Sequence, residues 1–310
     1  MKKIKKLAQK AKKKIRSWTR DHLAIATLYG FLLLYPLIWT FSVMYGLGIT
    51  ELLSSFSLGE PLDPFLGNTL SRGGHLAIQL LLVWLIARLV LEEGLREIGF
   101  RLREEWRRDL LLGLSATGAV MASLFLLEAA FGWLSIEGWR WQGIDLSNWL
   151  VHLWIALLSS AVAALGEEAI FRGYLLRGLK GEWNKWSALA LSSFLFSISH
   201  LSVTGAENTN FIFFALMMTL PGFMLGTLYL RTGSLWLPVG IHFGWNFFQS
   251  DLFALSGGEP GPASFGAITK MKGPQWLLGT NYGIEVGLVG VLSAFLVWGI
   301  CWYWTSAQNN

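Results

Sequence analysis

The sequence predicts an all-α, polytopic membrane protein with about eight transmembrane helices. Hydrophobic residues make up 53% of its 310 residues and charged residues only 15%, well below the roughly 25% charged content of soluble domains. Apolar runs long enough to cross a bilayer, which takes about 20 residues each, recur along the chain. Because lipid offers no hydrogen bonds to an open backbone, such runs form helices. We therefore expect a multi-pass integral membrane protein.

Eight apolar runs define the expected helices. The second and fifth runs are short, so their limits are the least well defined. The first follows a basic segment, as in a signal peptide, but it is too long for one and shows no small-residue cleavage pattern, so we expect it to be retained. The runs lie at 23–45, 75–91, 110–134, 149–176, 187–203, 211–230, 234–253 and 283–304.

The amino-terminal segment is strongly basic. Ten of the 25 Lys and Arg residues lie between Lys2 and Arg20, where there is no acidic residue. If helical, the segment would place Leu7, Ala11 and Ile15 on one stripe, an arrangement that suits anionic lipids. The same charges would also act simply as an orientation signal. Because the excess charge is confined to this tail, it does not indicate nucleic-acid binding.

The distribution of basic residues predicts how the chain is oriented. The segment between the second and third runs and the segment after the fourth are basic, and we place both in the cytoplasm. The intervening stretches 46–74, 135–148 and 204–210 hold only Arg72 and Arg140 as basic residues. An even number of helices then puts both termini in the cytoplasm. The same alternation places the loop 256–282 outside the cytoplasm. This loop contains Lys270 and Lys272, so it fits that position less well.

Three of the apolar runs carry polar residues whose burial in lipid is energetically costly. An ionisable group inside a bilayer costs several kcal/mol, so such residues are candidates for a functional site. They occur in the fourth, fifth and seventh runs and are Glu167, Glu168, Arg172, His200, His242 and Asn246.

Helical spacing predicts that these side chains converge. Glu168 and Arg172 are four residues apart, so they share a helix face and can form an ion pair, whereas Glu167 points about 100° away. His242 and Asn246 also share a face. At roughly 1.5 Å per residue, the side chains lie about 12 to 20 Å from the cytoplasmic helix ends. We therefore expect one polar chamber that opens to the cytoplasm.

The chemistry of these groups suits amide hydrolysis. A carboxylate beside an imidazole can deprotonate and orient a water molecule. An imidazole and a carboxamide on a neighbouring helix can donate hydrogen bonds to the oxyanion of a tetrahedral intermediate. The same side chains offer an alternative, because Glu167, His200 and His242 are the ligand types of a hydrolytic zinc site. The residue types alone leave both alternatives open.

Three motifs resemble those of a known family. The motifs are Glu-Glu-x-x-x-Arg at 167–172, Phe-x-x-x-His at 196–200 and His-x-x-x-Asn at 242–246. In this order they resemble the CAAX protease and bacteriocin-processing family of intramembrane peptidases, also called the Abi family, and the resemblance covers about 149–248.

The resemblance implies a role for each residue of the motifs. Glu167 would activate water with His200 as its partner, and His242 with Asn246 would stabilise the oxyanion. Glu168 and Arg172 would be a buried ion pair that supports the site, together with Phe196. No cofactor would be required, although family members have also been described as metalloproteases, which keeps zinc as the alternative. The substrate would be a membrane-associated or prenylated protein or peptide.

The resemblance also divides the chain into five predicted segments. The catalytic core would be flanked by accessory helices, and the last helix would follow a loop that contains Gly and Pro. The segments are the basic amphipathic segment 1–20, the accessory helices 21–148, the catalytic core 149–254, the loop 255–282, and the last helix with its tail 283–310.

Two other classes of function fit some of these observations. A scaffold subunit of a larger membrane complex could keep the fold without cleaving anything. A proton-coupled transporter also needs buried carboxylates and histidines, but it predicts an internal inverted repeat, and none is evident. Glu128, a further carboxylate in the third run, is assigned no catalytic role, although it could line the chamber.

Overall fold

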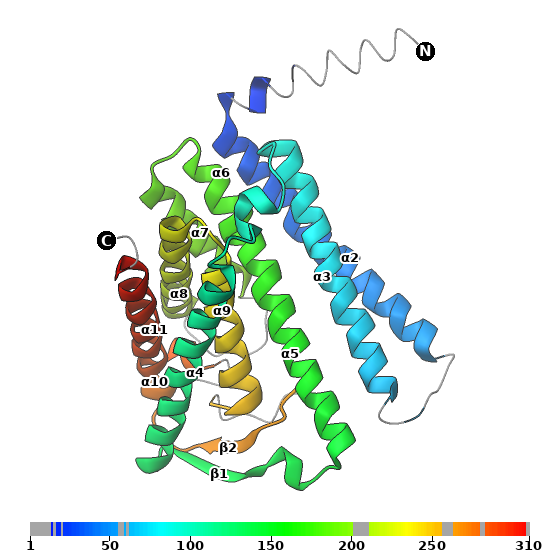
Figure 1. Cartoon of the computed structure of the whole chain (residues 1–310), viewed down its shortest axis with the longest axis vertical. Coiled ribbons are helices and arrows are strands. Elements are labelled where there is room, and N and C mark those ends of the chain that lie inside the picture. The colour runs from blue at the N-terminus through cyan, green and yellow to red at the C-terminus, as the bar shows by residue number, and fades with distance from the viewer. Residues whose placement is uncertain are drawn as a thin grey trace.

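The computed structural model confirms an all-α membrane architecture (Figure 1). It describes residues 14, 17–19, 21–54, 59, 62–200, 211–255, 263–279 and 283–307. The predicted amphipathic segment 1–20 therefore lies almost wholly outside the described residues. Within them, six helices are long and apolar enough to cross a membrane.

All eight predicted apolar runs have a helical counterpart. Two of these helices, α7 and α9, have 15 and 11 residues and are too short to satisfy the same criterion of length and composition. The eight are α2 (Leu23–Ser54), α3 (Leu62–Val90), α4 (Trp106–Ala130), α5 (Leu146–Glu168), α7 (Lys185–Ser199), α8 (Phe211–Thr232), α9 (Trp236–Asn246) and α11 (Leu288–Ala307).

Shorter elements extend and connect these helices. The helix α5 continues through a π-helical segment, η3 (Ala169–Leu176), into α6 (Arg177–Lys180), and α9 continues through η5 (Phe247–Leu252). The loop predicted at 255–282 contains β2 (Ala267–Met271), which pairs antiparallel with β1 (Leu134–Trp139). The remaining elements are η1 (Arg96–Phe100), η2 (Arg140–Gln142), α10 (Gln275–Leu278) and η6 (Ile284–Val286).

The helix α3 begins earlier than the predicted run. It starts at Leu62 rather than near His75, so most of the stretch that we expected to be a loop is helical. Asn68 and Arg72 lowered the hydropathy of this stretch, yet both side chains line a cavity between α3 and α5. The helix can therefore carry polar residues at membrane depth without exposing them to lipid.

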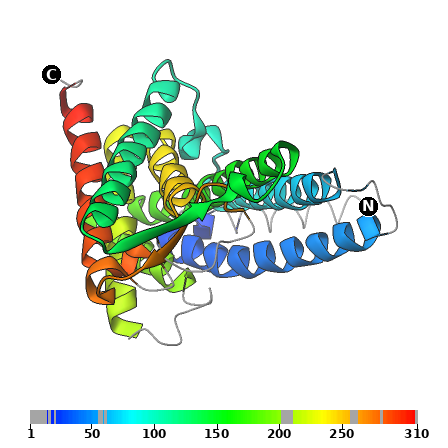
Figure 2. The ribbon, with the colours of Figure 1, turned by 90° about the horizontal axis from the view of Figure 1, so that it is seen from below.

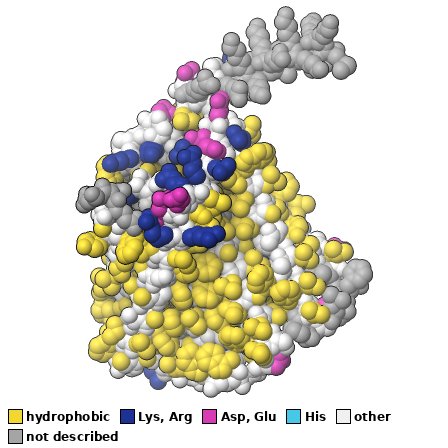
Figure 3. All heavy atoms as spheres, in the orientation of Figure 1, with side chains coloured by type: hydrophobic (Ala, Val, Ile, Leu, Met, Phe, Trp, Pro, Cys, Tyr) yellow, Lys and Arg dark blue, Asp and Glu magenta, His cyan; other side chains and the backbone are white. Residues whose placement is uncertain are grey.

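The helices form two groups that meet at α5. Figure 2 shows α2 and α3 as a pair on one side and α4, α8, α9 and α11 on the other. The start of α2 and the end of α11 both lie towards the end of the bundle where α6 lies (Figure 1). Figure 3 shows charged side chains gathered near this end above a broad apolar face. The orientation of the termini relative to the membrane stays a prediction.

The amino end of α5 is fixed by Asp145. Its carboxylate accepts a hydrogen bond of 3.0 Å from the Asn148 backbone N–H, which caps the first turn. Hydrogen bonds from Ser147 and Asn148 lower the pKa of Asp145 to about 2. The cap therefore holds the start of the helix whose other end carries Glu167 and Glu168.

The helix α9 packs directly against the backbone of α4. A Cβ atom at Gly240 would lie 2.3 Å from the Leu110 carbonyl oxygen, and one at Gly113 would lie 2.7 Å from the Ile241 nitrogen. Small residues permit such close approach between helices in membranes. This contact sets the position of α9, which carries His242 and Asn246.

The close approach predicts that Gly240→Ala is destabilising. The new methyl group must push α4 and α9 apart, and overpacking of this kind costs about 1–3 kcal/mol. We expect a lower unfolding temperature of the protein in detergent, measured by thermal unfolding. Gly299→Ala on α11 is the matched control, because a Cβ there would meet nothing within 4 Å. Equal unfolding temperatures for the two variants would contradict this packing account.

Candidate functional site

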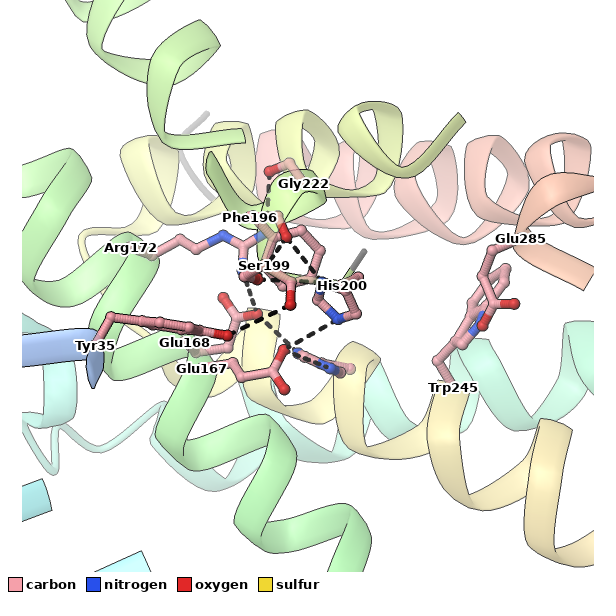
Figure 4. Close-up of polar contacts among 11 residues, drawn as sticks. Tyr35, Glu167, Glu168, Arg172, Phe196, Ser199, His200, Gly222, Trp245 and Glu285 are labelled. Atoms are coloured by element: carbon pink, nitrogen blue, oxygen red, sulfur yellow. Dashed lines mark hydrogen bonds and ion pairs between the residues drawn. The ribbon is translucent and has the colours of Figure 1, made fainter. Parts of the chain in front are cut away.

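The three motifs meet where α5, α7 and α9 approach one another. Glu167 and Glu168 are the last residues of α5, and Arg172 lies in the π-helical segment η3 that follows. His200 directly follows α7, and His242 with Asn246 lies on α9. Three separate stretches of chain thus bring the predicted residues to one region (Figure 4).

A buried carboxylate connects two of the motifs. The Oε1 atom of Glu168 accepts a hydrogen bond of 2.7 Å from Arg172 Nη1 and one of 2.9 Å from His242 Nδ1. The Arg172 guanidinium also donates through Nη2 to the Gly222 carbonyl oxygen on α8, at 3.1 Å. Glu168 and Arg172 are 0% and 1% exposed. The predicted ion pair is therefore present, and it reaches further than predicted, to α8 and to His242.

Phe196 packs between the charged groups. The Arg172 guanidinium carbon lies 4.4 Å from the centre of its ring, a cation–π contact. The rings of His200 and His242 lie 4.5 Å and 6.1 Å from it, centre to centre. Phe196, which is only 4% exposed, thus contacts the Arg172 guanidinium and both imidazoles.

Glu167 faces both histidines. Its Oε2 atom lies 3.6 Å from His200 Nε2 and 3.8 Å from His242 Nε2. These separations exceed a direct hydrogen bond. The same Oε2 atom is buried and has no hydrogen-bond partner among the described residues. The Nε2 atoms of both imidazoles therefore lie close to the same carboxylate oxygen.

The outer hydrogen bonds orient both imidazoles. His200 Nδ1 lies 2.8 Å from the Phe196 carbonyl oxygen. A carbonyl oxygen can only accept, so this nitrogen carries a proton and donates it. His242 Nδ1 likewise donates to the Glu168 carboxylate at 2.9 Å. Both rings consequently present Nε2 to Glu167.

Two cavities flank these side chains. The first, of about 300 Å³, is lined by His200, His242 and Asn246 together with apolar side chains of α8 and α11. The second, of about 510 Å³, is lined by Glu167 and by residues of α2, α3 and α5. We expected Glu167, His200, His242 and Asn246 to line one chamber. This expectation was wrong, because Glu167 lines the second cavity and the other three line the first.

Three residues on the first cavity were missed by the sequence analysis. Glu285, in η6, accepts hydrogen bonds from Trp245 Nε1 at 2.8 Å and from Gln249 Nε2 at 3.1 Å. Figure 4 shows the Trp245–Glu285 pair on the side of His200 away from Glu167. The sequence did contain a sign of this site, because Glu285 lies at the start of the last apolar run, where an ionisable residue is costly.

Glu128 lies outside the site. It is 1% exposed, and both of its carboxylate oxygens lack a hydrogen-bond partner among the described residues. It is absent from the residues lining either of the two cavities. The expectation that Glu128 could line the chamber thus receives no support from these cavities.

The alternative of a metal site has a geometric test. Within the part of the chain that the structure describes, no group of three or more His, Cys, Asp or Glu side chains is arranged to hold a metal ion. This includes the set of Glu167, His200 and His242 that the residue types suggested. The choice between a metal-free site and a metal site therefore stays a prediction.

The Glu168 network predicts a large effect of Arg172→Ala on stability. The change leaves a buried carboxylate without its counter-charge, which costs about 3–5 kcal/mol. We expect the unfolding temperature to fall much further than in Arg177→Ala. Arg177 pairs with Glu93, with Nη2 to Oε1 at 2.7 Å, but its side chain is 34% exposed, and pairs nearer solvent contribute about 1 kcal/mol or less. Similar losses in both variants would contradict the buried network.

Comparison with known proteins agrees with the motifs. The family model described as type II CAAX prenyl endopeptidase Rce1-like matches residues 148–248, a range that includes all three motifs. No curated protein and no solved structure matches the chain. The match over 148–248 agrees with the family that the resemblance of the motifs predicted.

Proposed function

We propose that the protein is an intramembrane endopeptidase that hydrolyses a peptide bond of a membrane-associated or prenylated protein or peptide. One observation carries the proposal. Glu167 Oε2, buried and without a hydrogen-bond partner among the described residues, faces two imidazole Nε2 atoms at 3.6 and 3.8 Å. The family of the segment 148–248 supports a peptidase of the CAAX type.

Glu167 and His200 would activate the water. Atoms 3.6 Å apart are too far for a direct hydrogen bond, but one water oxygen can lie at about 2.8 Å from both. His200 donates through Nδ1 to Phe196, so a neutral ring offers the lone pair of Nε2 to this water. Glu167 accepts a proton from the water as its oxygen bonds to the scissile carbonyl carbon.

His242 and Asn246 would stabilise the oxyanion that results. Both line the first cavity, whereas Glu167 lines the second. When the His242 ring is protonated, its Nδ1–H donates to Glu168 and its Nε2–H can donate to the oxyanion. With His242 protonated, the charges of Glu167, Glu168, Arg172 and His242 sum to zero, which lowers the cost of burying them.

Collapse of the intermediate would complete hydrolysis. The carbon–nitrogen bond breaks, and the proton held by Glu167 passes to the leaving amine, so that a carboxylic acid and an amine are released; the acid then gives its proton to the amine or to water. The first cavity is lined by Met218, Met224, Leu225, Leu228 and Val297 among others. This apolar lining suits the hydrophobic part of a membrane-associated substrate.

The mechanism predicts that Glu167→Gln abolishes cleavage. The amide is nearly isosteric but cannot accept the proton of the water, and loss of a general base lowers the rate about 10²- to 10⁴-fold. The measurement is the turnover of a prenylated peptide by purified protein in detergent, followed by mass spectrometry. Glu128→Gln is the matched control, since Glu128 is also a buried carboxylate but lines neither of the two cavities. Full activity of folded Glu167→Gln would refute the assignment.

We also propose that the reaction needs no metal ion. The carboxamide of Asn246 suits an oxyanion donor better than a metal ligand. We expect turnover to be unchanged after dialysis against a chelator, and elemental analysis of the active protein to find less than one zinc per chain. Loss of activity on chelation with recovery on addition of zinc would overturn this part of the proposal and assign Glu167, His200 and His242 as ligands.

A further inference from the structure

The first cavity contains a carboxylate that the proposed mechanism does not use. Glu285 lines this cavity together with Gln249. Figure 4 shows Glu285 on the side of His200 away from Glu167. Both Glu285 and Gln249 lie outside the segment 148–248 that matches the family model. The pair is therefore a feature of this chain that the match does not describe.

Two neutral donors hold the Glu285 carboxylate in place. Its Oε1 atom accepts from Trp245 Nε1 at 2.8 Å, and its Oε2 atom accepts from Gln249 Nε2 at 3.1 Å. These two bonds fix the positions of both oxygens. A carboxylate has about four lone-pair sites, so each oxygen can accept a further hydrogen bond. The group is thus oriented and keeps acceptor capacity for a ligand.

The charge of Glu285 has no basic partner nearby. Among the described residues, no Lys or Arg lies within 4.0 Å of its carboxylate, and none lines the first cavity. Its electrostatic interaction with His200 supplies no charge, because the proposed mechanism keeps that ring neutral. An ionised carboxylate among membrane-spanning helices is strongly disfavoured without a counter-charge. A cation bound in the cavity would remove this cost.

Gln249 supplies a second acceptor at the same place. Its side chain lines the first cavity and is 2% exposed. Because its Nε2 atom donates to Glu285, its Oε1 atom is left over. That oxygen is buried and has no hydrogen-bond partner among the described residues, so it requires a donor. A carboxylate and an amide oxygen together match the ammonium of lysine or the guanidinium of arginine, since both of these groups only donate.

These acceptors are within reach of a peptide bound at the candidate site. Gln249 follows His242 by seven residues along α9 and η5, a rise of about 10 Å at roughly 1.5 Å per residue. An extended peptide covers about 3.3–3.6 Å per residue, so about three residues span that distance. Much of the remaining lining is apolar, including Met218, Leu225 and Val297, and it suits the methylene stem of a long cationic side chain.

We propose that Glu285 and Gln249 form a subsite for a cationic side chain of the substrate, lysine or arginine, within about three residues of the scissile bond. The inference rests on the proposed peptidase function and adds a rule for the choice of substrate. A lysine or arginine near the cleavage site raises the rate of cleavage, because its cation pairs with Glu285 and donates to the amide oxygen of Gln249.

The test compares peptides that differ in one side chain. Each carries either lysine or norleucine, an uncharged side chain with the same carbon stem, at one position within about three residues of the scissile bond, apart from the position that carries the lipid. We expect the wild-type protein to cleave the lysine peptide with a kcat/KM about 10-fold higher at one of these positions, the effect of hydrogen bonds to a charged group less the cost of taking lysine out of water. Arginine there should also raise kcat/KM, whereas acetylated lysine should not.

Substitutions at the subsite should change this preference. In Glu285→Gln the ratio of kcat/KM for lysine to that for norleucine should fall below one, because the amide keeps the size of the side chain but leaves the cation without a counter-charge. Gln249→Met removes the amide oxygen and should lower the ratio, which tests the subsite even if Glu285→Gln does not fold. Glu128→Gln is the matched control and should keep the preference, since Glu128 is a buried carboxylate that lines neither cavity.

The outcomes separate this inference from the function on which it rests. Equal kcat/KM for lysine and norleucine at every position would leave the peptidase intact and overturn the subsite, as would a lysine preference that persists in Glu285→Gln. If the wild-type protein cleaves no peptide, the peptidase function fails, and the dissociation constants of the same peptides test the subsite alone. Tighter binding of a lysine peptide that Glu285→Gln abolishes would then support the subsite, and equal binding would overturn it.

A lipid headgroup is the other source of an ammonium group. Nanodiscs that contain phosphatidylethanolamine or phosphatidylglycerol test this source, because only the first of these lipids carries an ammonium. We expect the lysine preference in both. A dependence on phosphatidylethanolamine that Glu285→Gln abolishes, without any lysine preference, would assign the subsite to the lipid and overturn the proposal.

Discussion

The hydrogen bonds that Glu168 accepts are the interaction on which the site depends. One buried carboxylate oxygen receives both Arg172 Nη1 and His242 Nδ1. Neither charge could remain at this depth alone, because an unpaired ion in a low-dielectric interior costs several kcal/mol. The bond from Arg172 lies within the continuous helix of α5 and η3, whereas the bond from His242 forms only where α9 contacts this helix. Its formation also turns the Nε2 atom of His242 towards Glu167.

The backbone around this network is built to bring the helices close. The segment η3 follows α5 directly after Glu168 and continues the helix with a wider turn, a feature often found at functional sites. Gly113 and Gly240 let α4 and α9 approach to backbone contact. The Gly222 carbonyl oxygen accepts from Arg172 and so ties α8 to the same cluster. Close packing and buried charge thus both hold α4, α5, α8 and α9 together.

Much of this arrangement could be predicted from the sequence. Apolar runs interrupted by Glu167, His200 and His242 predicted both the helices and the convergence of these side chains, because lipid penalises isolated ionisable groups. The ion pair of Glu168 with Arg172 followed from helical spacing alone. The catalytic roles stay predictions, since geometry shows proximity and not turnover.

Other features depend on contacts between distant segments and could not be predicted. Arg72 lowered the hydropathy of its stretch and suggested a loop, whereas the packing of α3 against α5 turns it into a cavity. Glu285 faces Trp245 only because η6 packs beside α9 and η5. The division of the expected chamber into two cavities likewise arises from the places of α3 and α11, whose apolar sequences carry no information about their neighbours.

The central claim is that Glu167 and His200 hold the attacking water while His242 and Asn246 bind the oxyanion. A structure with a bound peptide whose scissile amide is replaced by a ketone, which hydrates to a tetrahedral diol, tests it most directly. We predict one hydroxyl within hydrogen-bond distance of Glu167 Oε2 and His200 Nε2, and the other within reach of His242 Nε2 and the Asn246 amide. A diol bound elsewhere, or a covalent bond from Glu167 to the tetrahedral carbon, would contradict the account.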